Sequence, residues 1–402
     1  MALEKTWRWF GESDSISLPY LRQMGVEGVV TSLYHIPVGE VWQKNEIMRL
    51  KTIIEGYGLR WSVIESLPVS EGIKTHSSDY RSLIKNYNRS IINLGDCGID
   101  TVCYNFMPVL DWARTNLYYR TEQCSESMLF DYPTFAAFDR FILKRKEADK
   151  DYPEEILRKS EEIFKLMSQE AQGELAYNII IKTQAFVHGV VEQSNNYEEK
   201  FLQHLKVYKH IDANQLRNNL FSFLHDVIPI AEKAGVNMCI HPDDPPFPLL
   251  GLPRIASTLD DFIKIIQQYD SVANGITFCT GSLSSGNAND VVKMAQKLAH
   301  RVNFIHLRNT VQLPDNSFYE SGHLSGCVDM YAIVKILLEE QINRINDGRT
   351  DIRMPFRPDH GLRILDDFNR EANPGYPLIG RLKGLAEIDG LQTGIERNLL
   401  HV

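Results

Sequence analysis

The chain has 402 residues, 43% hydrophobic and 24% charged, so it can bury a large core. Its formal net charge of −9 argues against a nucleic acid or a membrane as main partner, because those partners need clustered positive charge. The start of the chain lacks an apolar stretch of signal-peptide length, and no run of about 18 apolar residues occurs. We therefore expect a cytoplasmic protein whose six scattered cysteines stay reduced.

Short apolar, β-branched or aromatic runs recur along the chain and predict buried strands. They occupy residues 6–11, 26–33, 59–66, 100–108, 236–244, 275–281, 301–309 and 351–361. Helical patterns separate them, most clearly over 214–234, where Gly235 is the expected C-terminal stop. Ser257 or Thr258, and then Asn289, are the expected N-caps of two later helices. Eight strands alternating with helices predict an α/β fold, a (β/α)8 TIM barrel with parallel strands.

One stretch, residues 109–205, interrupts this alternation between the fourth and fifth strands. It contains two charged helical patterns broken near Pro153, and a barrel of this class needs only roughly 250 residues. The stretch is therefore predicted to be a helical insertion on the catalytic face. It would serve as a lid over the substrate or as an oligomer contact. We expect the whole chain, 1–402, to form one domain with this insertion embedded in it.

Four polar residues stand where predicted strands meet their following loops: His241, Cys279, His306 and Asp359. The chemistry of a TIM barrel lies at the carboxyl ends of its strands, so these side chains are predicted to converge. A single buried histidine or cysteine is more often a packing residue than a ligand. Four potential ligands on successive strand ends are not expected from independent packing choices. The pattern therefore predicts a metal site.

The types of ligand atom narrow the choice of metal ion. Two nitrogens, a sulfur and a carboxylate oxygen suit a divalent first-row ion, and calcium is disfavoured because it prefers an all-oxygen shell. A tetrahedral ion would be closed off by four protein ligands. An ion that accepts five or six ligands, such as Fe²⁺ or Mn²⁺, keeps room for substrate oxygens.

The motifs around these residues resemble those of the mannonate dehydratase family across essentially the whole chain. The motifs are WRWFGESD, TSLYHIPVGEVW, CIHPDDPP, CTGS, FIHLRN, HLSGCVDM and RPDHG. The resemblance implies a xylose-isomerase-like TIM barrel that uses Mn²⁺ or Fe²⁺ to remove water from D-mannonate. The product would be 2-dehydro-3-deoxy-D-gluconate, in hexuronate (glucuronate) breakdown.

Residue by residue, the resemblance implies the metal ligands His241, Cys279, His306 and Asp359. It also implies an acid–base pair formed by His360 of RPDHG and Tyr376 of NPGYPL. The sequence leaves open which of the two is the base. Because the loop that leads to Tyr376 has no independent support in the sequence, the sequence alone favours a turn tyrosine that packs on the last helix as the alternative role of that residue.

Further residues are predicted to line the substrate pocket. Arg308 and Arg357 point to the same face as the neighbouring ligands, and could hold the carboxylate or hydroxyls of the substrate. For Arg357, support of the metal-binding carboxylate is an equally good interpretation. Asn309, His35 and His323 are the remaining substrate-binding candidates. Arg8 is expected to be structural, and Asp243 and Asp244 to orient loops.

Two other interpretations stay open. A divalent-metal sugar isomerase or epimerase on the same barrel would use the same ion without releasing water. A non-catalytic sugar-binding protein would need no acid–base pair. A metal-dependent endonuclease is disfavoured by the negative charge. We expect a homodimer or higher homo-oligomer, because closed symmetric assemblies are common.

Overall fold

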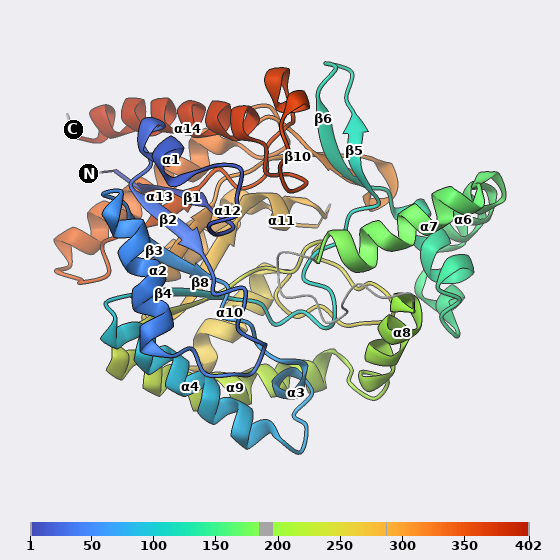
Figure 1. Cartoon of the computed structure of the whole chain (residues 1–402), viewed down its shortest axis with the longest axis horizontal. Coiled ribbons are helices and arrows are strands. Elements are labelled where there is room, and N and C mark those ends of the chain that lie inside the picture. Colours follow the sequence, from blue (N-terminus) through green and yellow to red (C-terminus); the bar gives the residue numbers. More distant parts are fainter. Residues whose placement is uncertain (1, 185–195, 287, 401–402) are drawn as a thin grey trace.

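Eight parallel strands close into a barrel in the computed structural model, which describes residues 2–184, 196–286 and 288–400 (Figure 1). Around the barrel the order is β1-β12-β9-β8-β7-β4-β3-β2. The strands are β1 (Glu4–Arg8), β2 (Gly28–Thr31), β3 (Arg60–Glu65), β4 (Thr101–Tyr104), β7 (Asn237–Ile240), β8 (Asn274–Cys279), β9 (Val302–His306) and β12 (Pro355–Arg357). Each overlaps one predicted run, so the (β/α)8 barrel is confirmed.

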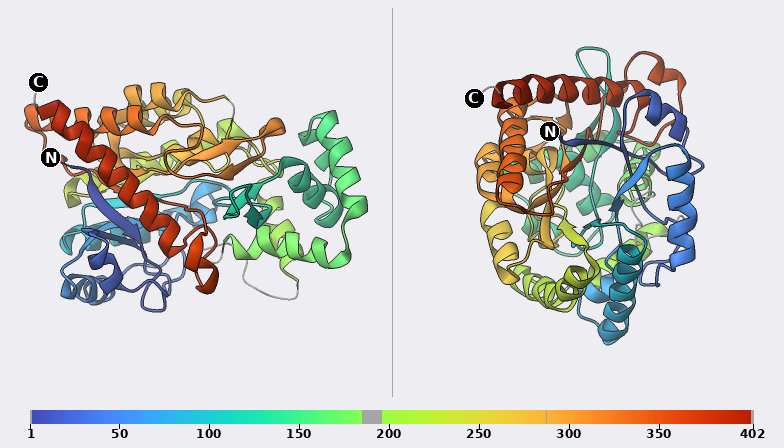
Figure 2. Two further views of the ribbon diagram at one scale, coloured as in Figure 1. Left: turned by 90° about the horizontal axis from the view of Figure 1, so that it is seen from above. Right: turned by 90° about the vertical axis from the view of Figure 1, so that its left-hand side faces the viewer.

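Helices surround the barrel, as the right-hand view of Figure 2 shows. They are α1 (Leu18–Gln23), α2 (Lys44–Gly56), α3 (Glu71–Lys74), α4 (Tyr80–Asp96), α9 (Ala213–Ala234), α10 (Leu259–Gln268), α11 (Thr280–Ser284), α12 (Val291–Leu298), α13 (Met330–Asn346) and α14 (Leu378–Leu400). Within the described residues, no helix is both long and apolar enough to span a membrane.

The ends of the helices follow the predicted signals, with one exception. Helix α9 stops at Gly235, which takes the left-handed conformation (φ 67°), and Thr258 forms a capping box with Asp261 at the start of α10. The predicted cap of α12, Asn289, was wrong. Asp290 caps that helix, because its carboxylate accepts a backbone N–H at 2.9 Å. The Asn289 amide instead donates to two backbone carbonyls of other segments.

The insertion is only partly the helical segment that was predicted. It contains β5 (Asn116–Arg120), β6 (Glu126–Phe130), α5 (Tyr132–Ala137), α6 (Glu154–Leu166), α7 (Gln169–Tyr177) and α8 (Tyr197–Val207). The break at Pro153 is confirmed, since α6 begins at the next residue. The β5–β6 hairpin was not predicted.

That hairpin belongs to a second sheet, in the order β10-β11-β6-β5. Strands β10 (Thr310–Gln312) and β11 (Phe318–Glu320) follow barrel strand β9 in the chain. We call this sheet the side sheet. In Figure 1 the hairpin lies between the barrel and the outlying helices α6 and α7. The side sheet therefore joins the insertion to the loop after a barrel strand that carries a predicted ligand.

A separate cluster of buried side chains fills the inside of the barrel. Its members are Val30, Val63, Cys103, Cys239 and Phe304. Side chains two residues apart on a strand point the same way, so His306 continues the row of Phe304. The two rings meet edge to face with their centroids 4.6 Å apart. The cluster thus forms the floor beneath the strand ends.

Candidate metal and catalytic site

Three of the four predicted metal ligands converge at the carboxyl ends of neighbouring strands. His241 follows β7, while Cys279 and His306 end β8 and β9 and are paired in register. One ligand atom from each residue lies within 4.8 Å of the others, and His241 Nε2 is 3.2 Å from His306 Nδ1. These atoms could hold a single metal ion.

Asp359 brings the fourth ligand type to the same place. Its Oδ2 lies 3.8 Å from both Cys279 Sγ and His306 Nδ1. The residue stands two positions after β12, whose Arg357 is in register with His306. Its backbone is left-handed (φ 56°), a strained conformation for a residue other than glycine that is often found at functional sites.

The protonation of these groups suits metal binding. Burial lowers the pKa of His241 and of His306, so both imidazoles are neutral near pH 7. Burial acts to raise the pKa of Asp359, but the charges of Arg357 and Arg308 oppose it and hold that pKa well below its ordinary value. His241 Nδ1 is 2.7 Å from the Pro242 carbonyl, a contact that places the ring proton there and leaves Nε2 available to a cation. The donor set therefore fits a divalent ion.

His360 and Tyr376, the predicted acid–base pair, lie side by side. Their rings meet edge to face with centroids 5.0 Å apart, and the Trp112 ring lies 5.3 Å from His360. Burial lowers the pKa of His360. Burial raises the pKa of Tyr376 to about 12, against the opposing charge of Arg357. At neutral pH the two groups are thus a neutral imidazole and a phenol.

The two predicted arginines reach the pocket and are already paired there. Arg357 donates to Glu65 at 2.7 Å and to Asp359, and its Nε lies 3.1 Å from His306 Nε2. Arg308 pairs with Asp359 through its Nε, 3.1 Å from Oδ2. Both guanidinium groups are buried. They compensate the carboxylates around the predicted ion site.

The other two nitrogens of the Arg308 guanidinium take part in a buried cluster of ion pairs that the sequence did not reveal. Arg308 also binds Asp244 and Glu320, and Arg114 binds the same two carboxylates, at 2.8 Å and 2.7 Å. Asp244 had been expected to orient a loop, and no sequence signal marked Arg114 or Glu320. For Asp243, however, the predicted role in orienting a loop is supported, because its Oδ2 accepts a hydrogen bond from the Ala256 backbone N–H at 2.8 Å.

Two other pocket residues come from the first and third barrel strands. Glu65 is the last residue of β3 and forms an ion pair with Arg8 at 3.0 Å, in addition to its ion pair with Arg357. Burial acts to raise the pKa of Glu65, but the two arginines overcome it and lower that pKa. Arg8, which was expected to be structural, lines the pocket and donates to Tyr34 at 3.2 Å.

Three predicted substrate-binding residues are engaged elsewhere. His35 is 55% exposed and pairs with Glu46 at 3.1 Å, away from the pocket. The Asn309 amide donates to the carbonyls of His323 and Val328, and its oxygen accepts two backbone N–H groups. His323 is buried with Nε2 2.6 Å from the Pro358 carbonyl, so it supports the segment that carries Asp359.

His241, Asp359, His360 and Tyr376 line a small cavity of about 50 Å³. Its walls are Arg8, Glu65, Ser66, Asn105, Met107, Asp111, Trp112, His241, Asp244, Arg308, Arg357, Asp359, His360 and Tyr376. Asp111 and Trp112 come from the insertion. This volume is small beside the roughly 300–1,000 Å³ of most small-molecule pockets.

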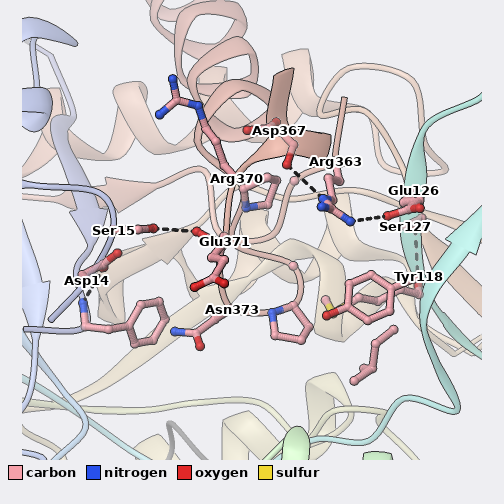
Figure 3. Close-up of a pocket in the computed structure, with 18 of the residues that line it drawn as sticks. Asp14, Ser15, Tyr118, Glu126, Ser127, Arg363, Asp367, Arg370, Glu371 and Asn373 are labelled. Atoms are coloured by element: carbon pink, nitrogen blue, oxygen red, sulfur yellow. Dashed lines mark hydrogen bonds and ion pairs between the residues drawn. The ribbon is translucent and has the colours of Figure 1, made fainter. Parts of the chain in front are cut away.

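A second cavity, of about 560 Å³, lies beside the first. Residues of the segment 361–377 and of the β5–β6 hairpin line it, as Figure 3 shows. Arg363 joins the two, because it donates to Glu126 at 2.9 Å. The wall between the cavities is thin at Gly375, where an added Cβ would lie 2.3 Å from Met128 and 3.3 Å from His360. The larger cavity contains none of the predicted ligands, so we place the chemistry in the smaller one.

Comparisons with known proteins agree on one family. The family model described as D-mannonate dehydratase (UxuA) matches residues 3–401. A mannonate dehydratase from Saccharophagus degradans is 44% identical over 98% of this chain and 98% of its own length. Mannonate dehydratase 1 from Agrobacterium fabrum is 45% identical over 99% of this chain and 98% of its own.

Solved structures give the same result. The crystal structure of mannonate dehydratase from Streptococcus suis serotype 2 superposes with a TM-score of 0.76. It is 32% identical in sequence and covers 99% of this chain and 95% of its own. A D-tagatose 3-epimerase-like protein matches with a TM-score of 0.51 at 10% identity, which shows a shared fold alone.

Proposed function

The chain belongs to the mannonate dehydratase family, and from this premise we propose that it removes water from D-mannonate to give 2-dehydro-3-deoxy-D-gluconate. It is thus a hydro-lyase of carbohydrate metabolism, and we assign it to hexuronate (glucuronate) breakdown. The observation that carries the proposal is the convergence of His241, Cys279 and His306 beside the His360–Tyr376 pair.

The ligands of the ion are His241, Cys279, His306 and Asp359, and the ion is Mn²⁺ or Fe²⁺. A bound divalent ion would supply positive charge that favours loss of the C2 proton next to a carboxylate. His306 would bind through Nδ1, since its Nε2 faces Arg357 Nε at 3.1 Å and Glu65 Oε1 at 3.5 Å. Arg357 and Glu65 therefore hold the orientation of this ring.

Two protons must move in the elimination step. One leaves C2 of the substrate, and one is delivered to the C3 hydroxyl as it departs as water; the enol that remains then ketonises to the 2-keto acid. His360 and Tyr376 share these transfers, since both line the cavity and touch each other. Each positioned acid or base contributes about 10²–10⁴-fold. For Tyr376, a pKa of about 12 favours the protonated form, so a positive charge must approach it before it can act as a base.

Arg308 and Arg357 provide the positive charge that an aldonate carboxylate requires. Because both are bound to carboxylates of the protein, substrate binding exchanges partners rather than filling vacant donors. Asp111 and Trp112 give the insertion a place in the pocket wall, which favours a covering role for 109–205.

The insertion also has features of an oligomer contact. Leu166, at the end of α6, and Val207, at the end of α8 and two residues past the insertion, are 88% and 58% exposed. A second copy of the chain would cover such apolar side chains in a homodimer or higher homo-oligomer. We assign the protein to the cytoplasm, where Cys279, which forms no disulfide, stays reduced.

The test is conversion of D-mannonate by purified protein, measured as formation of a 2-keto acid with and without added Mn²⁺ or Fe²⁺. We expect turnover that EDTA abolishes and that either ion restores, together with about one bound ion per chain. A ketose or an epimeric aldonate as product, without loss of water, would favour an isomerase or epimerase instead. Protein that leaves D-mannonate unchanged at full metal content would refute the proposal.

A further inference from the structure

One edge of the His360 ring is fixed by two buried charges. His360 Nδ1 lies 2.6 Å from Arg308 Nη1 and 3.1 Å from Glu320 Oε1, and those two atoms are 2.7 Å from each other. His360, Arg308 and Glu320 are 6%, 1% and 1% exposed. The opposite ring atom, Nε2, lies on the side of Asp359, 3.7 Å from its Oδ1. The contacts at Nδ1 therefore determine where Nε2 points.

Glu320 is not a residue of the barrel. It ends β11 in the side sheet, where β11 pairs with β6 of the insertion. Ser127 of β6 donates to the Glu320 backbone carbonyl at 2.7 Å. Arg114, which precedes β5 and is fully buried, donates to Glu320 Oε1 at 2.7 Å. The insertion thus holds Glu320 through both its backbone and its carboxylate.

We propose that Glu320, anchored by Arg114, is the positioning residue for His360, and that the insertion acts on the reaction through this contact. The proposal rests on the proposed function, in which His360 transfers a proton. A carboxylate on one nitrogen of a histidine commonly fixes the orientation of the other nitrogen. Burial acts to raise the pKa of Glu320, but Arg308 and Arg114 overcome it and lower that pKa to about 2, so the anchor remains charged.

The first test compares Glu320→Gln with wild type in the metal-loaded enzyme. The amide keeps the shape of the side chain and removes its charge. We expect kcat to fall about 10–100-fold, the range seen when such a supporting partner is lost, with KM and metal content within about threefold of wild type. An unchanged kcat would overturn the proposal. So would a loss confined to KM, metal content or the folded fraction.

Asp139→Asn is the matched control. Asp139 is a buried carboxylate of the same insertion that binds Arg145 at 2.7 Å and Tyr152 at 2.8 Å, outside the pocket. Its loss removes a buried charge without touching His360. We expect a lower melting temperature with kcat within about twofold of wild type. A kcat loss equal to that of Glu320→Gln would show a general effect of destabilising the insertion and overturn the proposal.

The double variant Glu320→Gln/His360→Asn tests whether the effect passes through His360. Once His360 is gone, loss of Glu320 should lower kcat by no more than about twofold further, because residues that act as a unit are not additive. Independent, multiplied losses would overturn the proposal.

A crystal structure of metal-loaded Glu320→Gln separates this inference from the proposed function. We expect the His360 ring to leave its position beside Arg308 or to occupy two orientations. An undisturbed ring overturns the positioning role, whatever the protein does to D-mannonate. Wild-type protein that is inert toward D-mannonate would refute the function, while the ring position would still decide this inference.

Discussion

The barrel and the side sheet build the same pocket by different means. The barrel brings His241, Cys279 and His306 together through strand register, so their ligand atoms meet within 4.8 Å. The side sheet supplies Glu320 through a buried ion cluster that includes Arg114. Register is set by local patterns of alternation, whereas the ion cluster depends on contacts between distant segments. We therefore expect that the proposed metal binding and the proposed proton transfer can be disturbed separately.

The largest expected effect separates proton transfer from metal binding, which we propose for the adjacent residues His360 and Asp359. His360→Asn should lower kcat by about 10²–10⁴-fold, because asparagine cannot transfer a proton, while the ligands of the ion remain. Activity assays and metal analysis on the same preparation measure both quantities. His300→Asn, the same change at an exposed histidine, is the control. Loss of the metal together with the activity would show that the two functions are not separable here.

The second prediction concerns the charge of the side-sheet contact. The folded pKa of Glu320 is about 2, below its ordinary value of 4.5, so ionised Glu320 stabilises the fold above pH 4.5. This contribution is lost as pH falls from 4.5 toward 2. At pH 7, Glu320→Gln should cost about 3–5 kcal/mol, because it leaves buried arginines short of an anion.

Urea unfolding of wild type and Glu320→Gln between pH 7 and pH 3 measures this difference. The free-energy gap between the two proteins should narrow below pH 4.5, since the variant lacks the titrating group. A gap that stays constant over this range would mean that Glu320 is not held ionised by its neighbours.

The sequence predicted the residues of the barrel strands better than those of the side sheet. Cys279 and His306 were identifiable because each ends a buried run, and the parallel barrel brings such ends together. Glu320 was not, because β11 has three residues, too few for a period to be recognised, and its partner β6 lies far away in the chain. His35 follows a predicted strand in the same way as the predicted metal ligands do. The loop after that strand turns its side chain outward, and strand periodicity says nothing about such a turn.

A smaller effect is expected from a barrel element that was predicted correctly. Thr258→Ala removes the capping box of α10 and should lower the free energy of unfolding by about 0.5–2 kcal/mol, with kcat unchanged. Thermal or urea unfolding measures the change. Thr393→Ala, within α14 and exposed, is the control, and it should be neutral or slightly stabilising because alanine favours helix. A loss of kcat in Thr258→Ala would mean that this helix cap affects catalysis, and it would contradict the expectation that the cap contributes to stability alone.

The smallest effect is expected at His35, where sequence and structure disagree. His35→Ala should leave kcat/KM within about twofold of wild type, because its side chain is 55% exposed and pairs with Glu46 rather than with a pocket residue. An exposed ion pair of this kind contributes little to stability, so the melting temperature should also stay the same.

His323→Ala is the contrasting variant, since its ring contacts the Pro358 carbonyl next to Asp359 and its loss should lower metal affinity. A tenfold fall in kcat/KM for His35→Ala at unchanged stability would mean that the loop after β2 turns inward during turnover. The pocket would then be completed by a barrel loop as well as by Asp111 and Trp112 of the insertion.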